Sequence, residues 1–143
     1  MKVAIGGDHA GYEYKGNILS WLQEKNFVTA DFGPYTDESV DYPDAVHPLC
    51  RAIEKGDYEF GILICGSGNG VCMTANKHQG IRAGLAWDTE IAQLIRQHNN
   101  ANVICIPARF TDPDQALDLV KAFLETPFEG GRHQRRVDKI ACS

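Results

Sequence analysis

Short apolar runs alternate with amphipathic stretches along the chain, a pattern typical of strands and helices in turn. The runs at 3–5, 27–32, 60–65, 81–86 and 103–106 predict five strands. The run at 60–65 is apolar throughout, as expected for a strand buried on both faces of a parallel sheet. The alternation therefore predicts an α/β fold built on a five-stranded parallel sheet.

The intervening segments carry helix signals. Ile18, Trp21 and Leu22 are spaced three and four positions apart, which predicts one face of a helix. Further helices are expected over about residues 43–55 and from the Gly-rich segment after the third strand to about Gly80.

Later helices have clearer boundaries. Asp88 and Asp112 are expected N-caps, the second strengthened by Pro113 at the first helical position, and Pro127 is expected to end that helix. The tail 129–143 predicts one more helix. Because it follows a complete series of strands and helices, we expect it to pack on a second subunit.

Length and composition narrow the class of protein. A chain of 143 residues predicts a single domain over residues 1–143, and 43% apolar with 23% charged residues is ordinary for a soluble protein. We expect no membrane span, and the early polar residues argue against a signal peptide. The net charge of -5 disfavours nucleic-acid binding, although residues 132–139 are locally basic.

The cysteines indicate a reducing compartment. There are five, an odd number without a C-x-x-C pair, which argues against a disulfide framework and a structural zinc site. The cytoplasm is the expected location.

Two loops stand out at the expected ligand-binding edge. Parallel sheets bind ligands beyond the carboxyl ends of their strands where the order reverses, and the commonest order, 2-1-3-4-5, reverses between strands one and three. Segments 6–11 and 65–70 follow those strands and carry Asp, His, Cys and Ser among glycines. The plainer alternative is two tight turns that need glycine. Neither segment matches a dinucleotide or P-loop motif, so no cofactor is expected.

Cys65 differs from the other cysteines because it directly precedes a loop of backbone N–H groups that opens a helix. Such a position favours the thiolate, which could act as a general base or as a nucleophile. The amides of 66–70 with the Ser67 hydroxyl could hold an oxyanion. A base beside an oxyanion hole suits enolisation next to a carbonyl, whereas the alternative is a buried structural thiol, as expected for Cys50 and Cys105.

A second set of candidates lies late in the chain. His98 ends a helix and could be either functional or a C-terminal cap. Arg132 and Arg136 are four apart, so they share a helix face and suit a phosphate group, although a solvated charged face is the alternative.

Together these motifs closely resemble ribose-5-phosphate isomerase of the B type, a family that includes galactose-6-phosphate and allose-6-phosphate isomerases. The resemblance rests on GGDHAGY (6–12), DYP (41–43), ICGSGNG (64–70), ANK (75–77), RQHN (96–99) and EGGRHQRRV (129–137). It implies a flavodoxin-like (Rossmann-like) three-layer sandwich that forms a homodimer with shared active sites. It also implies aldose–ketose interconversion of ribose 5-phosphate and ribulose 5-phosphate through a cis-enediolate, without metal or organic cofactor.

The resemblance also assigns roles to residues. Cys65 would move the proton between C2 and C1, Ser67 and the loop amides would stabilise the enediolate, and His98 would assist ring opening. The implied catalytic residues are Cys65, Ser67, His98 and Asp8, and the implied substrate-binding residues are His9, Tyr42, Gly66, Gly68, Asn69, Gly70, Asn99, Arg109, Arg132, His133 and Arg136.

The family has a second version, in which a Glu after the Gly-rich loop is the base. Here that position is Val71, so Cys65 has no rival in the loop, although Asn69 is a feature of the Glu version. The alternatives are an isomerase of a six-carbon sugar phosphate and, more remotely, a non-catalytic flavodoxin-like sensor of anions or thiol oxidation.

Overall fold

The computed structural model describes residues 1–142, so Ser143, the last residue of the expected tail helix, lies outside the described residues. The strands are β1 (Lys2–Gly7), β2 (Val28–Asp31), β3 (Phe60–Cys65), β4 (Ala83–Leu85) and β5 (Val103–Pro107). The α-helices are α1 (Tyr12–Glu24), α2 (Pro43–Glu54), α3 (Asn69–Ala75), α4 (Thr89–Gln97), α5 (Pro113–Glu125) and α6 (Arg132–Asp138), with short 3₁₀ turns η1 (His9–Gly11) and η2 (Ala108–Phe110).

All five strands are parallel in the order β2-β1-β3-β5-β4, so the expected order 2-1-3-4-5 is wrong at one edge. Every residue of β5 is buried, whereas the three residues of β4 are only half-buried. The longer apolar strand therefore takes the inner position, and the short Ala-Gly-Leu strand takes the edge. The reversal of order between β1 and β3 is unaffected, because β1 pairs with both β2 and β3.

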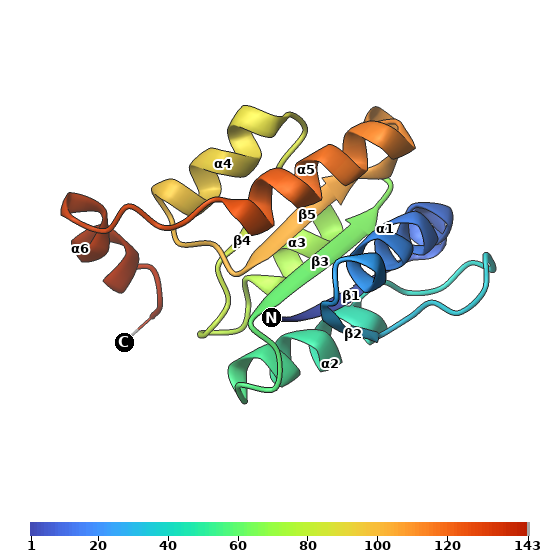
Figure 1. Ribbon diagram of the computed structural model, residues 1–143. Coiled ribbons are helices and arrows are strands. Elements are labelled where there is room, and N and C mark those ends of the chain that lie inside the picture. The colour runs from blue at the N-terminus through green and yellow to red at the C-terminus, as the bar shows by residue number, and fades with distance from the viewer. Residues whose placement is uncertain (143) are drawn as a thin grey trace.

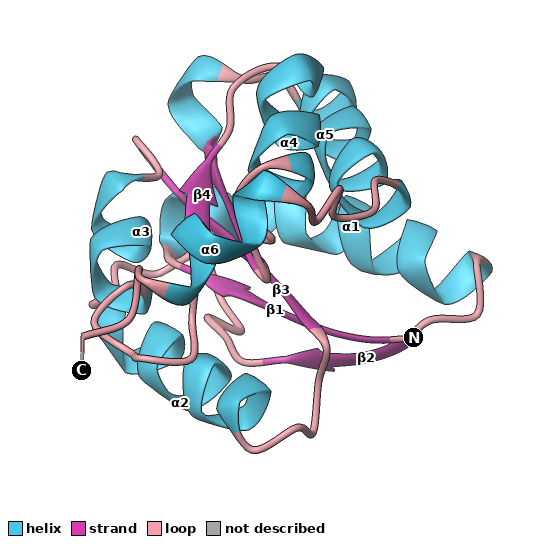
Figure 2. Ribbon diagram, turned by 90° about the vertical axis from the view of Figure 1, so that its left-hand side faces the viewer, coloured by secondary structure: helices cyan, strands magenta, loops and turns pink. Residues whose placement is uncertain are grey.

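Helices cover both faces of the sheet, which confirms the three-layer α/β class (Figure 2). α1, α4 and α5 pack on one face around Phe123, while α2 and α3 pack on the other around Leu49 and Leu63. The expected N-caps are confirmed: Asp88 accepts a hydrogen bond from Ile91 N–H, and Asp112 accepts one from Gln115 N–H.

Two helices are shorter than expected. α3 ends at Ala75 rather than near Gly80, because the chain leaves the helix in a turn that leads to β4. α6 begins at Arg132, since Gly130 and Gly131 have φ values of +70° and +56°, which a right-handed helix does not allow.

The outer edge of β4 is paired with a side chain instead of a strand. The Asn76 carboxamide donates to the Ala83 carbonyl at 2.9 Å and accepts from the Ala83 N–H at 2.8 Å. It therefore takes the place of a neighbouring peptide group.

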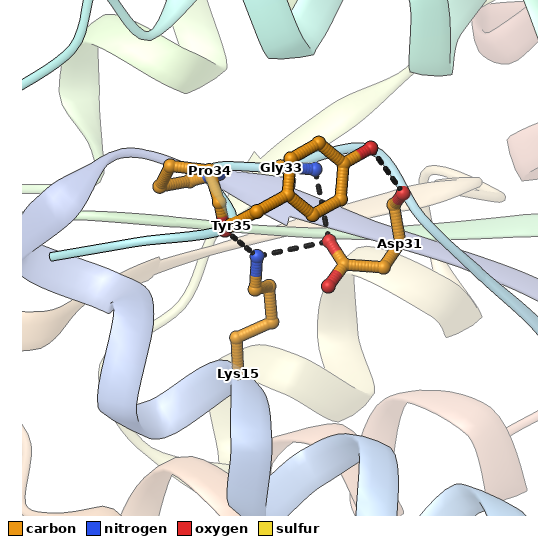
Figure 3. A network of polar contacts seen from close by, with 5 residues as sticks. All are labelled: Lys15, Asp31, Gly33, Pro34 and Tyr35. Atoms are coloured by element: carbon orange, nitrogen blue, oxygen red, sulfur yellow. Dashed lines mark hydrogen bonds and ion pairs between the residues drawn. The ribbon is translucent and has the colours of Figure 1, made fainter.

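A buried lysine joins α1 to the end of β2 (Figure 3). Lys15 Nζ donates to Asp31 Oδ1 at 2.9 Å and to the Pro34 carbonyl, and the same Asp31 oxygen accepts from Gly33 N–H. The Lys15 side chain is only 5% exposed, so its charge depends on these oxygens.

The tail projects from the rest of the structure. Figure 1 shows α6 beyond the amino ends of the strands, on the side away from the β3 and β5 arrowheads. Val137 is the only residue of α6 that is buried. Within residues 1–142, none of the helices has both the length and the apolar character needed to cross a membrane.

Candidate functional site

The site residues expected from the sequence fall into two groups, one at the carboxyl ends of the strands and the other at their amino ends. Ten follow the carboxyl ends of β1, β3 and β5 or lie at the start of α2, and we call them the carboxyl-edge cluster. Its members are Asp8, His9, Tyr42, Cys65, Gly66, Ser67, Gly68, Asn69, Gly70 and Arg109. The other five form the amino-edge cluster, which consists of His98, Asn99, Arg132, His133 and Arg136.

Cys65 is the last residue of β3 and is 4% exposed, with Val71 and Cys105 in the same apolar cluster. A guanidinium lies close by. Arg109 donates its backbone N–H to the Gly66 carbonyl at 2.9 Å, and a Cβ added at Gly66 would lie 3.1 Å from Arg109 Nε. The Cys65 side chain is therefore buried, and the residue that follows it packs against a guanidinium.

Glycine is required where the loop after β3 turns into α3. Gly68 has φ +75°, and a Cβ there would lie 2.5 Å from a Leu85 methyl carbon. Ser67 Oγ accepts from Asn69 N–H at 3.3 Å, which fixes the turn. Part of the amide set expected to face a ligand therefore holds the loop itself.

The neighbouring loops close in on this turn. The Tyr42 ring packs on Gly70, because a Cβ at Gly70 would lie 2.4 Å from the ring carbon that bears the hydroxyl. Asp8 Oδ1 accepts from Ala10 N–H at 2.9 Å, and His9 Nδ1 accepts from Val40 N–H at 3.4 Å. Asp8, His9 and Tyr42 line an open cavity of about 510 Å³.

Residues 126–131, which we call the strap, connect α5 to α6 and cross the end of α4. The strap brings the residues of the amino-edge cluster together. Glu129 N–H donates to the Gln97 carbonyl at 3.1 Å, and Arg96 Nε donates to the Thr126 carbonyl at 3.1 Å. His98 ends α4, and its ring stacks on the His133 ring with centroids 4.4 Å apart and planes 12° apart.

Positive charge gathers around this stack. His98, Asn99, Arg132, His133 and Arg136 line a cavity of about 400 Å³. Loss of hydration lowers the pKa of His133, and the nearby His98 and Arg132 lower it further, against the opposing effect of Glu129. The surroundings of His133 therefore disfavour its protonated form.

Within one chain the two clusters do not meet. Cys65 ends β3, whereas His98 ends a helix that returns to the amino edge, and a six-residue strand spans about 20 Å. Proton transfer needs hydrogen-bond distance, so Cys65 and His98 of one chain cannot act on the same sugar.

Comparison with known proteins resolves which family this arrangement serves. The model of the family described as Ribose/Galactose Isomerase matches residues 3–140. This chain belongs to the ribose/galactose isomerase family.

Its relatives within the family match along nearly their whole length. A probable ribose-5-phosphate isomerase B of Mycoplasma genitalium is 46% identical, over 98% of this chain and 93% of the relative. A D-erythrulose-4-phosphate isomerase of Pectobacterium atrosepticum is 41% identical, over 98% and 93%. The crystal structure of ribose-5-phosphate isomerase B from Mycoplasma genitalium with bound ribulose-5-phosphate is 45% identical, covers 97% of this chain and 93% of that chain, and has a TM-score of 0.92.

Two of the other cysteines, Cys50 and Cys105, agree with a structural role. All five cysteines are free thiols. Burial, with the Glu54 charge adding to it, raises the pKa of Cys50 to about 12, and burial also raises the pKa of Cys105 well above its usual value. Both side chains are fully buried, as expected for residues of the core.

Sequence reasoning missed Glu129 as a member of the amino-edge cluster. Its carboxylate lies 3.8 Å from the Nε2 atoms of both His98 and His133. The i, i+4 spacing to His133 was a usable signal, but the contact with His98 depends on the strap, which no local pattern reveals.

Proposed function

We propose that this chain is an aldose–ketose isomerase that interconverts ribose 5-phosphate and ribulose 5-phosphate. The observation that carries the proposal is the 45% identical structure with bound ribulose-5-phosphate, which shares this fold over nearly the whole chain. The carboxyl-edge cluster offers the groups that enolisation needs next to a carbonyl: a thiol, a hydroxyl and backbone amides.

The reaction moves one proton between adjacent carbons. Cys65, as the thiolate, takes the proton from C2 of the open-chain aldose, and the electron pair of the C–H bond forms the C1–C2 double bond of the enediolate. The carbonyl electron pair moves onto O1 as the enediolate forms. The same thiol then returns the proton to C1, where the electron pair of the double bond forms the new C–H bond, while the proton of the O2 hydroxyl passes to O1, so that C2 becomes the carbonyl carbon of the ketose. Ser67 and the loop amides stabilise the oxyanion, and His98 and Asp8 assist in opening the sugar ring.

The active unit in this proposal is a homodimer in which the carboxyl-edge cluster of one copy faces the amino-edge cluster of the other. Arg109 and His9 from one copy, with Arg132, His133 and Arg136 from the other, would bind the phosphate. Tyr42 and Asn99 would line the sugar.

Charge supports this pairing. Segment 37–44, which borders the carboxyl-edge cavity, holds four acidic residues, whereas α6 carries three arginines. In an antiparallel pair of copies, each acidic segment would face the arginines of the other copy, so the same attraction would occur twice across one two-fold axis. The five free thiols support a reducing compartment, the cytoplasm, as the location.

The test is turnover of ribose 5-phosphate by the purified chain and by Cys65→Ala. We expect Cys65→Ala to lose about 10²–10⁴ in rate, as is typical for removal of a general base. Cys142→Ser, which changes an exposed thiol, is the matched control and should keep full activity. Near-normal turnover by Cys65→Ala would refute the assignment of the base.

Substrate length is a separate question. The relative named D-erythrulose-4-phosphate isomerase favours a four-carbon sugar phosphate as the second candidate. Comparing kcat/KM on four-, five- and six-carbon aldose phosphates under one set of conditions ranks the candidates directly. The five-carbon proposal fails if another length is preferred.

A further inference from the structure

A buried guanidinium lies behind the amino-edge cluster. Arg96 is in the last turn of α4, two residues before His98, and is 8% exposed. Its Cζ atom lies 5.0 Å from the centroid of the Phe60 ring and 5.9 Å from that of the Phe123 ring. Because these rings belong to β3 and α5, the guanidinium is anchored between two elements of the core.

Arg96 bonds to both segments that carry the cluster. Its Nη1 donates to the Ala101 carbonyl at 2.7 Å and to Asn100 Oδ1 at 2.9 Å, which closes the turn that follows His98. Its Nε donates to the Thr126 carbonyl at 3.1 Å, where the strap begins. One planar group with donors in fixed directions therefore sets the strap against the end of α4.

The helix that follows the strap makes little buried contact of its own. Val137 is the only residue of α6 that is buried, and the side chains of Arg132 and Arg136 are exposed. The strap is held to the end of α4 at its start by Arg96 and in its middle by the backbone of Glu129. The place of the two arginines relative to α4 therefore depends on these bonds.

We propose that Arg96 is a positioning residue of the isomerase, which fixes the arginines of α6 relative to His98. The inference rests on the proposed function, in which these groups bind one sugar phosphate. Arg96 acts through them, because it is buried beneath the cluster and does not line its cavity. A lysine at this position would keep the charge near the aromatic rings, but it has no donor at the place of Nε, so the bond to the strap would be lost.

Amide hydrogen exchange of the full-length chain tests the positioning directly. Arg96→Lys should speed exchange in segments 98–101 and 126–131 by about tenfold or more, the usual effect of losing a hydrogen bond to a charged group. Exchange in segment 66–70, at the other end of the strands, should stay the same. Arg51→Lys, an exposed position of α2, is the matched control and should exchange like the parent.

Kinetics separate positioning from a loss of stability. Misplaced arginines should raise the KM of Arg96→Lys for ribose 5-phosphate by about tenfold or more, while kcat changes much less. Loss of folded protein would instead lower the apparent kcat at an unchanged KM. Ile18→Val, which removes a methylene group from the core, is the control for that effect and should keep the KM of the parent.

A second variant leaves Arg96 in place and removes one of its partners. Asn100 has φ +47°, a conformation that glycine adopts freely, so Asn100→Gly should fold. Without the bond from Arg96 Nη1 to its side chain, it should change exchange and KM in the same direction as Arg96→Lys, but by less. If Arg96→Lys does not fold, Asn100→Gly decides by the same two measurements.

Two results would overturn the inference. One is that Arg96→Lys and Asn100→Gly match Arg51→Lys in exchange and in KM. The other is faster exchange or a lower kcat at an unchanged KM, which would make Arg96 a purely structural residue. If the parent itself has no isomerase activity, the proposed function fails, and the exchange result still decides whether Arg96 holds the strap.

Discussion

Separation of the two clusters predicts that two inactive variants restore activity when mixed. One variant is Cys65→Ala, and the other carries both Arg132→Ala and Arg136→Ala. In a dimer that contains one copy of each, one site combines the intact Cys65 with the intact arginines, and the other site lacks both.

The expected loss of activity follows from the charged hydrogen bonds that are removed, and the expected recovery on mixing follows from the symmetry of the dimer. Hydrogen bonds to charged groups contribute about 1.5–3 kcal/mol each, so loss of both arginines should lower kcat/KM by about 10²–10⁴. Random pairing of equal amounts gives mixed molecules as about half of all dimers, each with one working site, so about a quarter of wild-type activity should return.

The assay is kcat/KM for ribose 5-phosphate after the two variants are unfolded together in reducing buffer and refolded. Each variant refolded alone should stay inactive. Wild type refolded in the same way measures the yield of the refolding procedure. A triple variant with all three substitutions, mixed with wild type, is the matched control. It should leave about a quarter of the activity if sites are shared between copies and about half if they are not. No recovery with the complementary pair would refute the shared site.

Two further predictions concern stability and thiol chemistry. Lys15→Met should lower the free energy of unfolding in urea by about 1–3 kcal/mol, because Asp31 and the Pro34 carbonyl lose their buried donor. The Asp31 side chain is 29% exposed, so water can replace part of the lost contact, which limits the loss of stability. Lys77→Met, at an exposed position, is its control, and equal stability of the two would contradict the role of the buried lysine. Alkylation of the folded protein at pH 8 should modify Cys142 and spare Cys50, since a pKa of about 12 leaves almost no thiolate until the pH rises toward that value. Comparable labelling of both thiols by mass spectrometry would contradict the burial of Cys50.

Local signals in the sequence were sufficient for most of the fold. The apolar run of β3 and the Asp88 and Asp112 caps depend on neighbouring residues only, and all three are confirmed. The position of β4 in the sheet could not be predicted in this way. The sequence pattern of a short strand is the same whether the strand lies at the edge of the sheet or inside it. Burial of all of β5 decides the order, and burial is a property of the assembled layers.

In the candidate site, too, some features follow from the sequence pattern and others only from the three-dimensional structure. Topology alone brings the loops after β1 and β3 together, since β1 and β3 are adjacent in the sheet. The contact between Tyr42 and Gly70 and the approach of Glu129 to His98 depend on loop paths that carry no periodic signal. Those contacts could be found only in three dimensions.

Asn76 also limits how copies of this chain can associate. The outward N–H and carbonyl of Ala83 are already engaged by its carboxamide, so an incoming strand finds no free partners at that residue. A sheet running continuously from one molecule to the next through β4 is therefore disfavoured, as is fibre growth from this border. Association at this border would therefore depend on side-chain contacts and not on strand pairing.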